Sequence, residues 1–198
     1  MMKTTEELIQ TGSIITQLQF LKNFNELNEK KETYHYDAMY QPIGVHYGNR
    51  FQSPYPCWET EYFVDCDFDM NKSIKSQVQR LFKKEIIDWR CRIRLTLTSE
   101  LKKSVQFQHS NSRSVGSVHH DTKDFAGVIP FDQSFTGGTA FYEYEWDKVP
   151  DITYGSWPNR LILYNGQRNH AACHDLTYEK RYMSVSYTHL TLPTNREV

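Results

Sequence analysis

The chain lacks several features that would assign it to a broad functional class at once. It has no apolar run long enough to cross a bilayer, and its 198 residues carry a formal net charge of −1. Such a balance offers no general electrostatic attraction to nucleic acid or to an anionic membrane surface. Four cysteines form no C-x-x-C pair, and no signal-peptide pattern is visible. We therefore expect a cytoplasmic protein with reduced thiols that binds neither nucleic acid nor membrane.

Repeats and low-complexity stretches are also missing, and the length suits one domain with a substantial core. Aromatic residues, in contrast, are abundant, with 13 Tyr and 11 Phe. Residues of this kind are enriched in strands, and they suit a strand-rich fold around a lined cavity.

The hydrophobic pattern changes period near the middle of the chain. Apolar residues recur at spacings of three and four between Ile74 and Ile86, which predicts an amphipathic helix on the outside of a sheet. From residue 89 to 98 the period becomes two, which predicts a half-buried strand. The polar positions of that strand include Arg90, Arg92 and Arg94, and we interpret them as a solvated face of the sheet.

Further short strands are expected, separated by turns rich in Gly, Pro, Asn and Asp. We place them at about 104–109, 117–121, 125–131, 139–145, 160–164 and 181–184. Gly137-Gly138 is interpreted as a hairpin turn. Many short strands after one helix are typical of a mainly β fold of the double-sheet, cupin-like jelly-roll kind with flanking helices.

Candidate metal ligands cluster in the run Val118-His119-His120-Asp121. Residues i and i+2 of a strand point to the same face, so one strand can present His119 and Asp121 side by side. His120 then points the opposite way, although a register slip of one residue would exchange the roles. A polar surface turn is the alternative for this run.

A third ligand is available further along the chain. His170 follows a strand and an Asn-Gly turn, from which it can reach back to the first pair, and His174 is its competitor. Two histidines and one carboxylate are the donors of a facial set that leaves positions of iron(II) open. We choose His119, Asp121 and His170 as the metal ligands.

The order of these motifs resembles that of the iron(II)- and 2-oxoglutarate-dependent dioxygenases, and more narrowly their prolyl-hydroxylase-like branch. The similar segments are His119 to Phe131, Gly137 to Tyr142 and Asn159 to Gly166, followed by His170 and a basic residue. The resemblance covers roughly residues 88 to 184, about half of the chain. It implies a double-stranded β-helix.

The same resemblance implies a function. Iron(II) and 2-oxoglutarate would be the cofactors, dioxygen and an unknown peptidyl or small-molecule substrate the partners, and hydroxylation the reaction. Arg181 would bind the distal carboxylate of 2-oxoglutarate, because arginine makes a two-pronged contact with a carboxylate. Relatives often carry the basic residue ten positions after the distal histidine, which here is Lys180, so Lys180 is the runner-up. Tyr142, Tyr164 and Gln106 could line the pocket, but tyrosine on a strand is usually a core residue, and we leave all three out of the predicted site.

Two other functions fit part of the pattern. A jelly roll can be a binding or structural module without a metal, and His119, His120, His170 or His174 could instead build a zinc site.

The last residues of the chain resemble a translated sequencing adapter and not a natural protein sequence. Residues Ser186 to Thr194 match the translation of a transposon-end sequencing adapter, and such segments are excluded from fold reasoning. We therefore divide the chain into three parts. Residues 1–87 are expected to form N-terminal helices and an irregular cover, 88–184 the double-stranded β-helix, and 185–198 a non-native tail.

Overall fold

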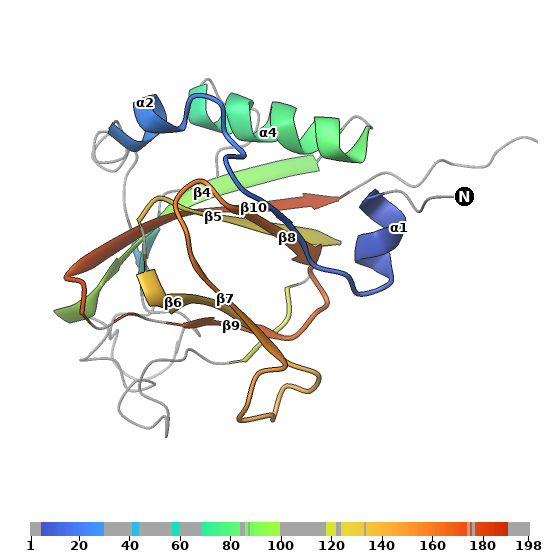
Figure 1. Cartoon of the computed structure of the whole chain (residues 1–198), viewed down its shortest axis with the longest axis vertical. Helices are drawn as coiled ribbons and strands as arrows, with labels where there is room; N and C mark the ends of the chain where they lie inside the picture. Colours follow the sequence, from blue (N-terminus) through green and yellow to red (C-terminus); the bar gives the residue numbers. More distant parts are fainter. Residues whose placement is uncertain are drawn as a thin grey trace, which may run out of the picture.

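Two antiparallel sheets face each other in the computed structural model of the chain, and helices cover the outer face of the larger sheet (Figure 1). The structure describes residues 5–29, 41–43, 57–59, 69–83, 86, 88–99, 118–121, 124–132, 134–173, 175 and 177–189. Within these ranges, no helix has the length and apolar character needed to span a membrane.

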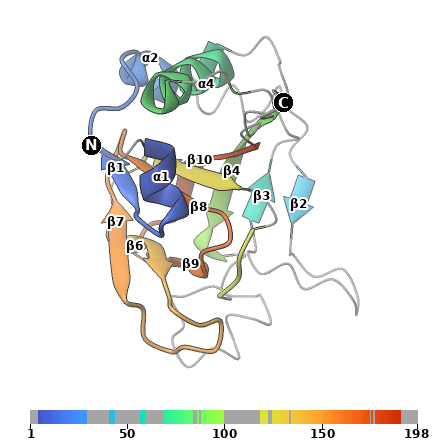
Figure 2. The same ribbon diagram turned by 90° about the vertical axis from the view of Figure 1, so that its right-hand side faces the viewer.

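The larger sheet has seven described strands in the order β1-β8-β5-β10-β4-β3-β2. Their bounds are Ile15–Gln17 for β1, Gln41–Ile43 for β2, Cys57–Glu59 for β3, Asp88–Leu97 for β4, Phe125–Pro130 for β5, Leu161–Asn165 for β8 and Lys180–His189 for β10. The smaller sheet has the order β7-β6-β9, and Figure 2 shows it below the larger one. Its strands are Ser134–Phe141 (β6), Ile152–Ser156 (β7) and His170–Cys173 (β9). Two facing antiparallel sheets with these crossovers confirm the expected jelly roll.

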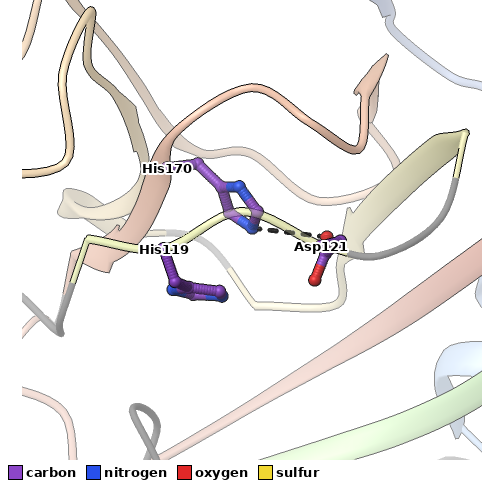
Figure 3. Close-up of side chains that lie close together, drawn as sticks. All are labelled: His119, Asp121 and His170. Atoms are coloured by element: carbon purple, nitrogen blue, oxygen red, sulfur yellow. Dashed lines mark ion pairs between the residues drawn. The ribbon is translucent and has the colours of Figure 1, made fainter.

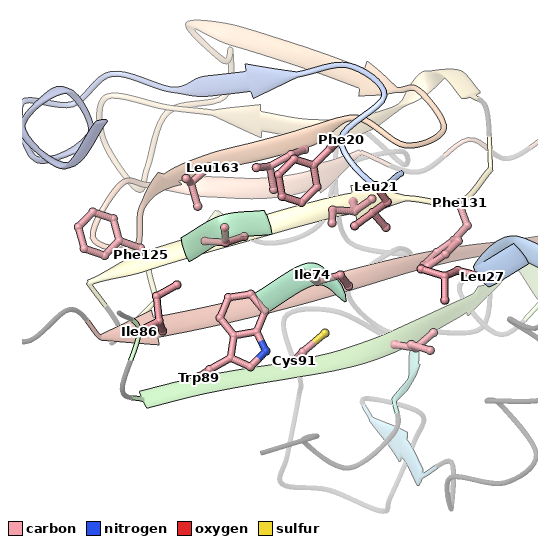
Figure 4. Close-up of a cluster of buried hydrophobic side chains, with 14 of the residues drawn as sticks. Phe20, Leu21, Leu27, Ile74, Ile86, Trp89, Cys91, Phe125, Phe131 and Leu163 are labelled. Atoms are coloured by element: carbon pink, nitrogen blue, oxygen red, sulfur yellow. The ribbon is translucent and has the colours of Figure 1, made fainter. Parts of the chain in front are cut away.

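Helix α4 (Asp69–Phe82) lies across the larger sheet, as the helical period predicted (Figure 1). Its Ile74 belongs to the buried hydrophobic cluster that Figure 4 shows. Ile74, Val78 and Phe82 share one face of the helix and are at most 5% exposed. Phe82 meets Phe125 of β5 edge to face, with ring centroids 5.1 Å apart. The helix ends where Lys83 takes a left-handed φ of 53°. Two shorter helices, α1 (Thr5–Gln10) and α2 (Phe24–Glu29), precede it among the described residues.

Strand β4 shows why the two faces of the larger sheet differ. Four alternate side chains of β4 are buried in the core beneath α4: Trp89, Cys91, Ile93 and Leu95. The intervening positions Arg90, Arg92 and Arg94 therefore face the other way and are half-buried. The interpretation of this face as solvated is wrong for Arg94, which lines a cavity between the two sheets. A polar side chain at every second position is compatible with exposure to water and with the lining of a polar cavity, so the alternation alone could not decide between them.

The predicted strands agree with the structure only in part. Residues 125–131 and 160–164 are strands β5 and β8 within one residue. Of the predicted strand 117–121, the described residues 118–121 contribute only an isolated bridge at His119. Strands β7 and β9 were not expected, and residues 104–109 lie outside the described part of the chain.

The interpretation of Gly137-Gly138 as a turn is wrong, because both residues lie within β6. A Cβ at Gly138 would overlap the Tyr154 carbonyl of β7, so glycine serves a close approach of two strands.

The segment before α2 is tied to the jelly roll by a buried asparagine. The backbone N–H of Leu21 donates to Asn159 Oδ1 at 2.7 Å, and Asn159 Nδ2 donates to the Leu21 carbonyl at 2.9 Å. Asn159 takes a left-handed φ of 57°, which asparagine tolerates better than most residues. These bonds hold Phe20 and Leu21 in the core, at 3% and 1% exposed.

Strand β10 continues past the predicted end of the natural sequence. It runs to His189, and Val185 is 2% exposed in the core. Residues 190–198 lie outside the described part of the chain. The non-native origin of 185–198 stays a prediction.

Candidate metal centre

The three predicted ligands come together at one point (Figure 3). One possible ligand atom from each of His119, Asp121 and His170 lies within 4.8 Å of those of the other two. His170 Nε2 and Asp121 Oδ2 are 3.5 Å apart. Among the described residues, this is the group of histidine, cysteine and acidic side chains that could hold a metal ion.

Backbone pairing brings the two histidines together across 51 residues of sequence. The N–H of His119 donates to the His170 carbonyl at 2.9 Å, and the N–H of His170 donates to the His119 carbonyl at 2.8 Å. A reciprocal bridge of this kind holds two side chains next to each other at the end of β9. The N–H of Asp121 donates to the Gly166 carbonyl at 2.7 Å, which holds the carboxylate beside them. His120 is exposed, so the register chosen from the H-x-D spacing agrees with this geometry.

The ring of His170 is oriented for coordination. Its Nδ1 lies 2.9 Å from the Arg168 carbonyl, so a proton on Nδ1 leaves the lone pair of Nε2 directed toward Asp121. Rings of Tyr164 and Phe141 pack against it, with centroids 4.9 and 6.3 Å away. Burial lowers the pKa of His170 to about 4, although the charge of Asp121 opposes the shift. A neutral imidazole at pH 7 is the form that binds metal.

Asp121 supplies an independent indication that a ligand belongs here. Its Oδ2 is buried and accepts no hydrogen bond from the described residues. A buried carboxylate oxygen without a hydrogen-bond partner costs free energy, and a cation would remove that cost. Two imidazole nitrogens and one carboxylate oxygen suit a divalent transition metal, and three protein ligands leave coordination positions open. The residues present therefore fit an iron(II) ion.

The histidines of the alternative zinc arrangement are not all at this point. His120 is exposed, and His174 lies outside the described residues. A closed four-ligand structural zinc site is not formed by the described side chains, whereas a three-ligand site open to a further molecule is.

Arg181 lies on β10, on the same face as Met183 and Val185, both of which line the cavity. It is 6% exposed, and its side chain reaches from the larger sheet to the smaller one. One terminal nitrogen donates to the Cys173 carbonyl at 2.9 Å, and the other donates to Ser156 Oγ. The side chain of Lys180, the runner-up, lies outside the described residues. Arg181 is thus held as a buried cation at the Cys173 end of β9.

The cavity beside the centre is lined by both sheets. Its lining consists of Arg94, His119, Val128, Gly138, Thr139, Tyr164, His170, Ala172, Met183 and Val185. Sequence reasoning missed Arg94 and set Tyr164 aside as a core residue. The signal for Arg94 was present, because the apolar positions of β4 assign the arginines to the face opposite the helix. Only the fold shows that this opposite face is directed toward the metal ligands.

No family model and no curated protein matches the sequence. Among solved structures, a prolyl-4-hydroxylase from Pseudomonas putida matches with a TM-score of 0.65 at 11% identity, covering 93% of this chain and 96% of that one. A prolyl hydroxylase from Trichoplax adhaerens, solved with a hypoxia-inducible-factor peptide, gives 0.64 at 12%, covering 94% and 87%.

An oxidoreductase of the 2OG-Fe(II) oxygenase family from Burkholderia pseudomallei gives a TM-score of 0.56 at 14% identity, covering 96% of this chain and 91% of that one. Identities this low establish a shared fold rather than a shared activity. The chain therefore has the jelly-roll fold of the 2-oxoglutarate-dependent oxygenases, with prolyl hydroxylases among its structural neighbours.

Proposed function

We propose that the chain is an iron(II)- and 2-oxoglutarate-dependent dioxygenase that hydroxylates a peptidyl or small-molecule substrate. The observation that carries the proposal is the convergence of His119, Asp121 and His170 beside a cavity between the two sheets. The fold supports it, because the solved structures that share it include a prolyl-4-hydroxylase and a 2OG-Fe(II) oxygenase family protein.

In this proposal His119, Asp121 and His170 hold the iron. Their backbone bonds and the contact of His170 with Arg168 fix the donor atoms before the metal arrives, which lowers the cost of ordering them. Bound iron(II) with 2-oxoglutarate supplies the oxidising chemistry, in which dioxygen is consumed and decarboxylation to succinate is coupled to hydroxylation of a C–H bond. The apolar part of the lining, Val128, Met183 and Val185, limits the access of water to that chemistry.

Arg181 binds the distal carboxylate of 2-oxoglutarate in the same proposal. Arg181 contacts Cys173 at one end of β9, and the ligand His170 stands at the other end. The separation of those two residues along the strand is about 10 Å. A short dicarboxylate that chelates the metal with one end can therefore direct its other carboxylate toward the guanidinium.

The experiment is anaerobic titration of the protein with iron(II) and 2-oxoglutarate, followed by the weak visible charge-transfer band of the chelate. His119→Ala, Asp121→Ala and His170→Ala should each abolish the band. His120→Ala is the matched control, because this imidazole is adjacent in sequence but exposed. A protein that binds zinc tightly and gives no band would be a zinc site. One that binds no metal would be a jelly-roll binding module.

A further inference from the structure

Arg94 brings a positive charge into the cavity from a strand that carries no proposed ligand. It lies on β4, where its register partner on β10 is Met183 and its register partner on β3 is Glu59. It lines the cavity together with His119 and His170, and it is half-buried. Arg94 therefore shares the cavity with two of the three proposed metal ligands.

The position of Arg94 differs from that of Arg181. Thr96 is the register partner of Arg181, so the two arginines are offset by two residues along the paired strands, about 7 Å. Arg181 extends to Cys173 and Ser156 on the smaller sheet. Arg94 is level with Met183, between the levels of Arg181 and Val185 on β10. The same face of the sheet therefore carries two cationic side chains at two levels, and of these two Arg94 is the one that lines the cavity.

A metal ion would add to this positive charge. The described carboxylate at the centre is Asp121, and a divalent ion bound there would leave the site with a net positive charge before either arginine is counted. A cavity of this kind has a potential that favours anions, and its low dielectric strengthens the attraction. The planar guanidinium of arginine suits a two-pronged contact with a carboxylate or phosphate.

We propose that Arg94 binds an anionic group of a molecule held beside the metal, as a second anion subsite separate from Arg181. The inference rests on the proposed function for the presence of the metal and the cosubstrate. The anionic group has two possible sources with the same chemistry. One is the carboxylate of 2-oxoglutarate nearest the metal, and the other is an acidic group of the substrate.

The first arm of the test measures cosubstrate binding to the Mn(II)-loaded protein by calorimetry. The ligands are 2-oxoglutarate and 2-oxobutyrate, which keeps the 2-oxo acid end and lacks the distal carboxylate. If Arg94 contacts the carboxylate near the metal, Arg94→Met should weaken both ligands about 10- to 100-fold, the effect of losing a charge-assisted hydrogen bond. Arg181→Ala should weaken 2-oxoglutarate alone. Arg94→Lys should restore part of the affinity.

The second arm tests the substrate as the source. Inorganic phosphate is added to the protein loaded with Mn(II) and 2-oxoglutarate, and the paramagnetic relaxation of its phosphorus nucleus reports binding close to the metal. If Arg94 is reserved for a substrate group, Arg94→Met should abolish this relaxation while the affinity for 2-oxoglutarate stays unchanged. Arg90→Met is the matched control in both arms, because Arg90 lies on the same face of β4 but opposite Tyr187, four residues away. It should retain wild-type behaviour.

An effect in either arm supports the subsite and identifies its source, whereas no effect of Arg94→Met in both arms overturns it. If Arg94→Met lowers the thermal midpoint but changes ligand binding in neither arm, the role of Arg94 is structural and the proposal is wrong.

Failure of the proposed function would be recognised separately. In that case the wild-type protein would bind neither Mn(II) nor 2-oxoglutarate. Phosphate titration of the metal-free protein, followed by phosphorus line broadening, would then decide the subsite. Line broadening that is lost in Arg94→Met and kept in Arg90→Met supports the anion subsite. Equal broadening in the wild type and both variants, or no broadening in the wild type, overturns it.

Discussion

The stability of the metal-free protein should fall as the pH is lowered from about 6.5 to about 4, because His170 is buried in its neutral form. Its pKa is lowered from 6.5 to about 4 by burial, so the unfolded chain binds a proton in this window that the folded chain does not. Stability therefore rises with pH across the window and is lost as the pH falls through it. A pKa difference of this size corresponds to about 3 kcal/mol of unfolding free energy, against a total stability of about 5–15 kcal/mol.

The assay is urea unfolding of the metal-free protein at several pH values between 7.5 and 4, compared with His170→Phe. Carboxylates elsewhere also titrate in this range, so the quantity of interest is the difference between the two proteins. The phenyl ring keeps an apolar contact with Tyr164 and Phe141 but cannot take up a proton. The variant should lose a constant amount of stability, from the missing contact with Arg168, and should show a shallower pH dependence than the wild type.

Parallel pH profiles for the two proteins would refute the reasoning, because they would show that His170 is protonated as readily in the folded chain as in the unfolded one. His120→Gln, which removes an exposed imidazole, serves as the surface control.

Three further predictions concern other described residues. Arg181→Ala should weaken 2-oxoglutarate binding about 10- to 100-fold and leave iron(II) affinity unchanged in anaerobic titration, since it removes a charge-assisted contact and no ligand; equal loss of both would indicate a folding defect. Gly138→Ala should lower the free energy of unfolding by about 2–4 kcal/mol in urea titration, because the added Cβ overlaps the Tyr154 carbonyl. Asn159→Ala should lower the free energy of unfolding by about 2–4 kcal/mol in the same assay, because it leaves the buried N–H and carbonyl of Leu21 without their partner. A decrease below about 1 kcal/mol would contradict this reasoning.

The elements with a strong hydrophobic period could be predicted from the sequence. Helix α4 and strands β4, β5 and β8 each carry a local apolar pattern that matches their buried side chains, as Ile74 and Val78 do between the helix and the sheet. Strand β9 could not be found in this way, because His170 to Cys173 is short and mixes polar and apolar residues. It is a strand because pairing with β6 completes its backbone hydrogen bonds.

The candidate ligands were predictable for a local reason. An i, i+2 spacing already assigns His119 and Asp121 to one side of an extended backbone, and the structure brings His170 to them. That His170 is the partner, within a bridge to His119, depends on a contact between residues 51 apart. Only the tertiary structure could decide it.

The sequence by itself determined which side of β4 is apolar, and therefore that its three arginines share the other side. It could not determine what that side faces, because both water and a polar cavity favour polar side chains. The smaller sheet turns that face inward and brings Arg94 into the cavity with His119 and His170. Gly138 follows the same rule, since its lack of a side chain is explained by a carbonyl on another strand. Local periodicity specifies the faces of elements, and packing between distant elements specifies what those faces meet.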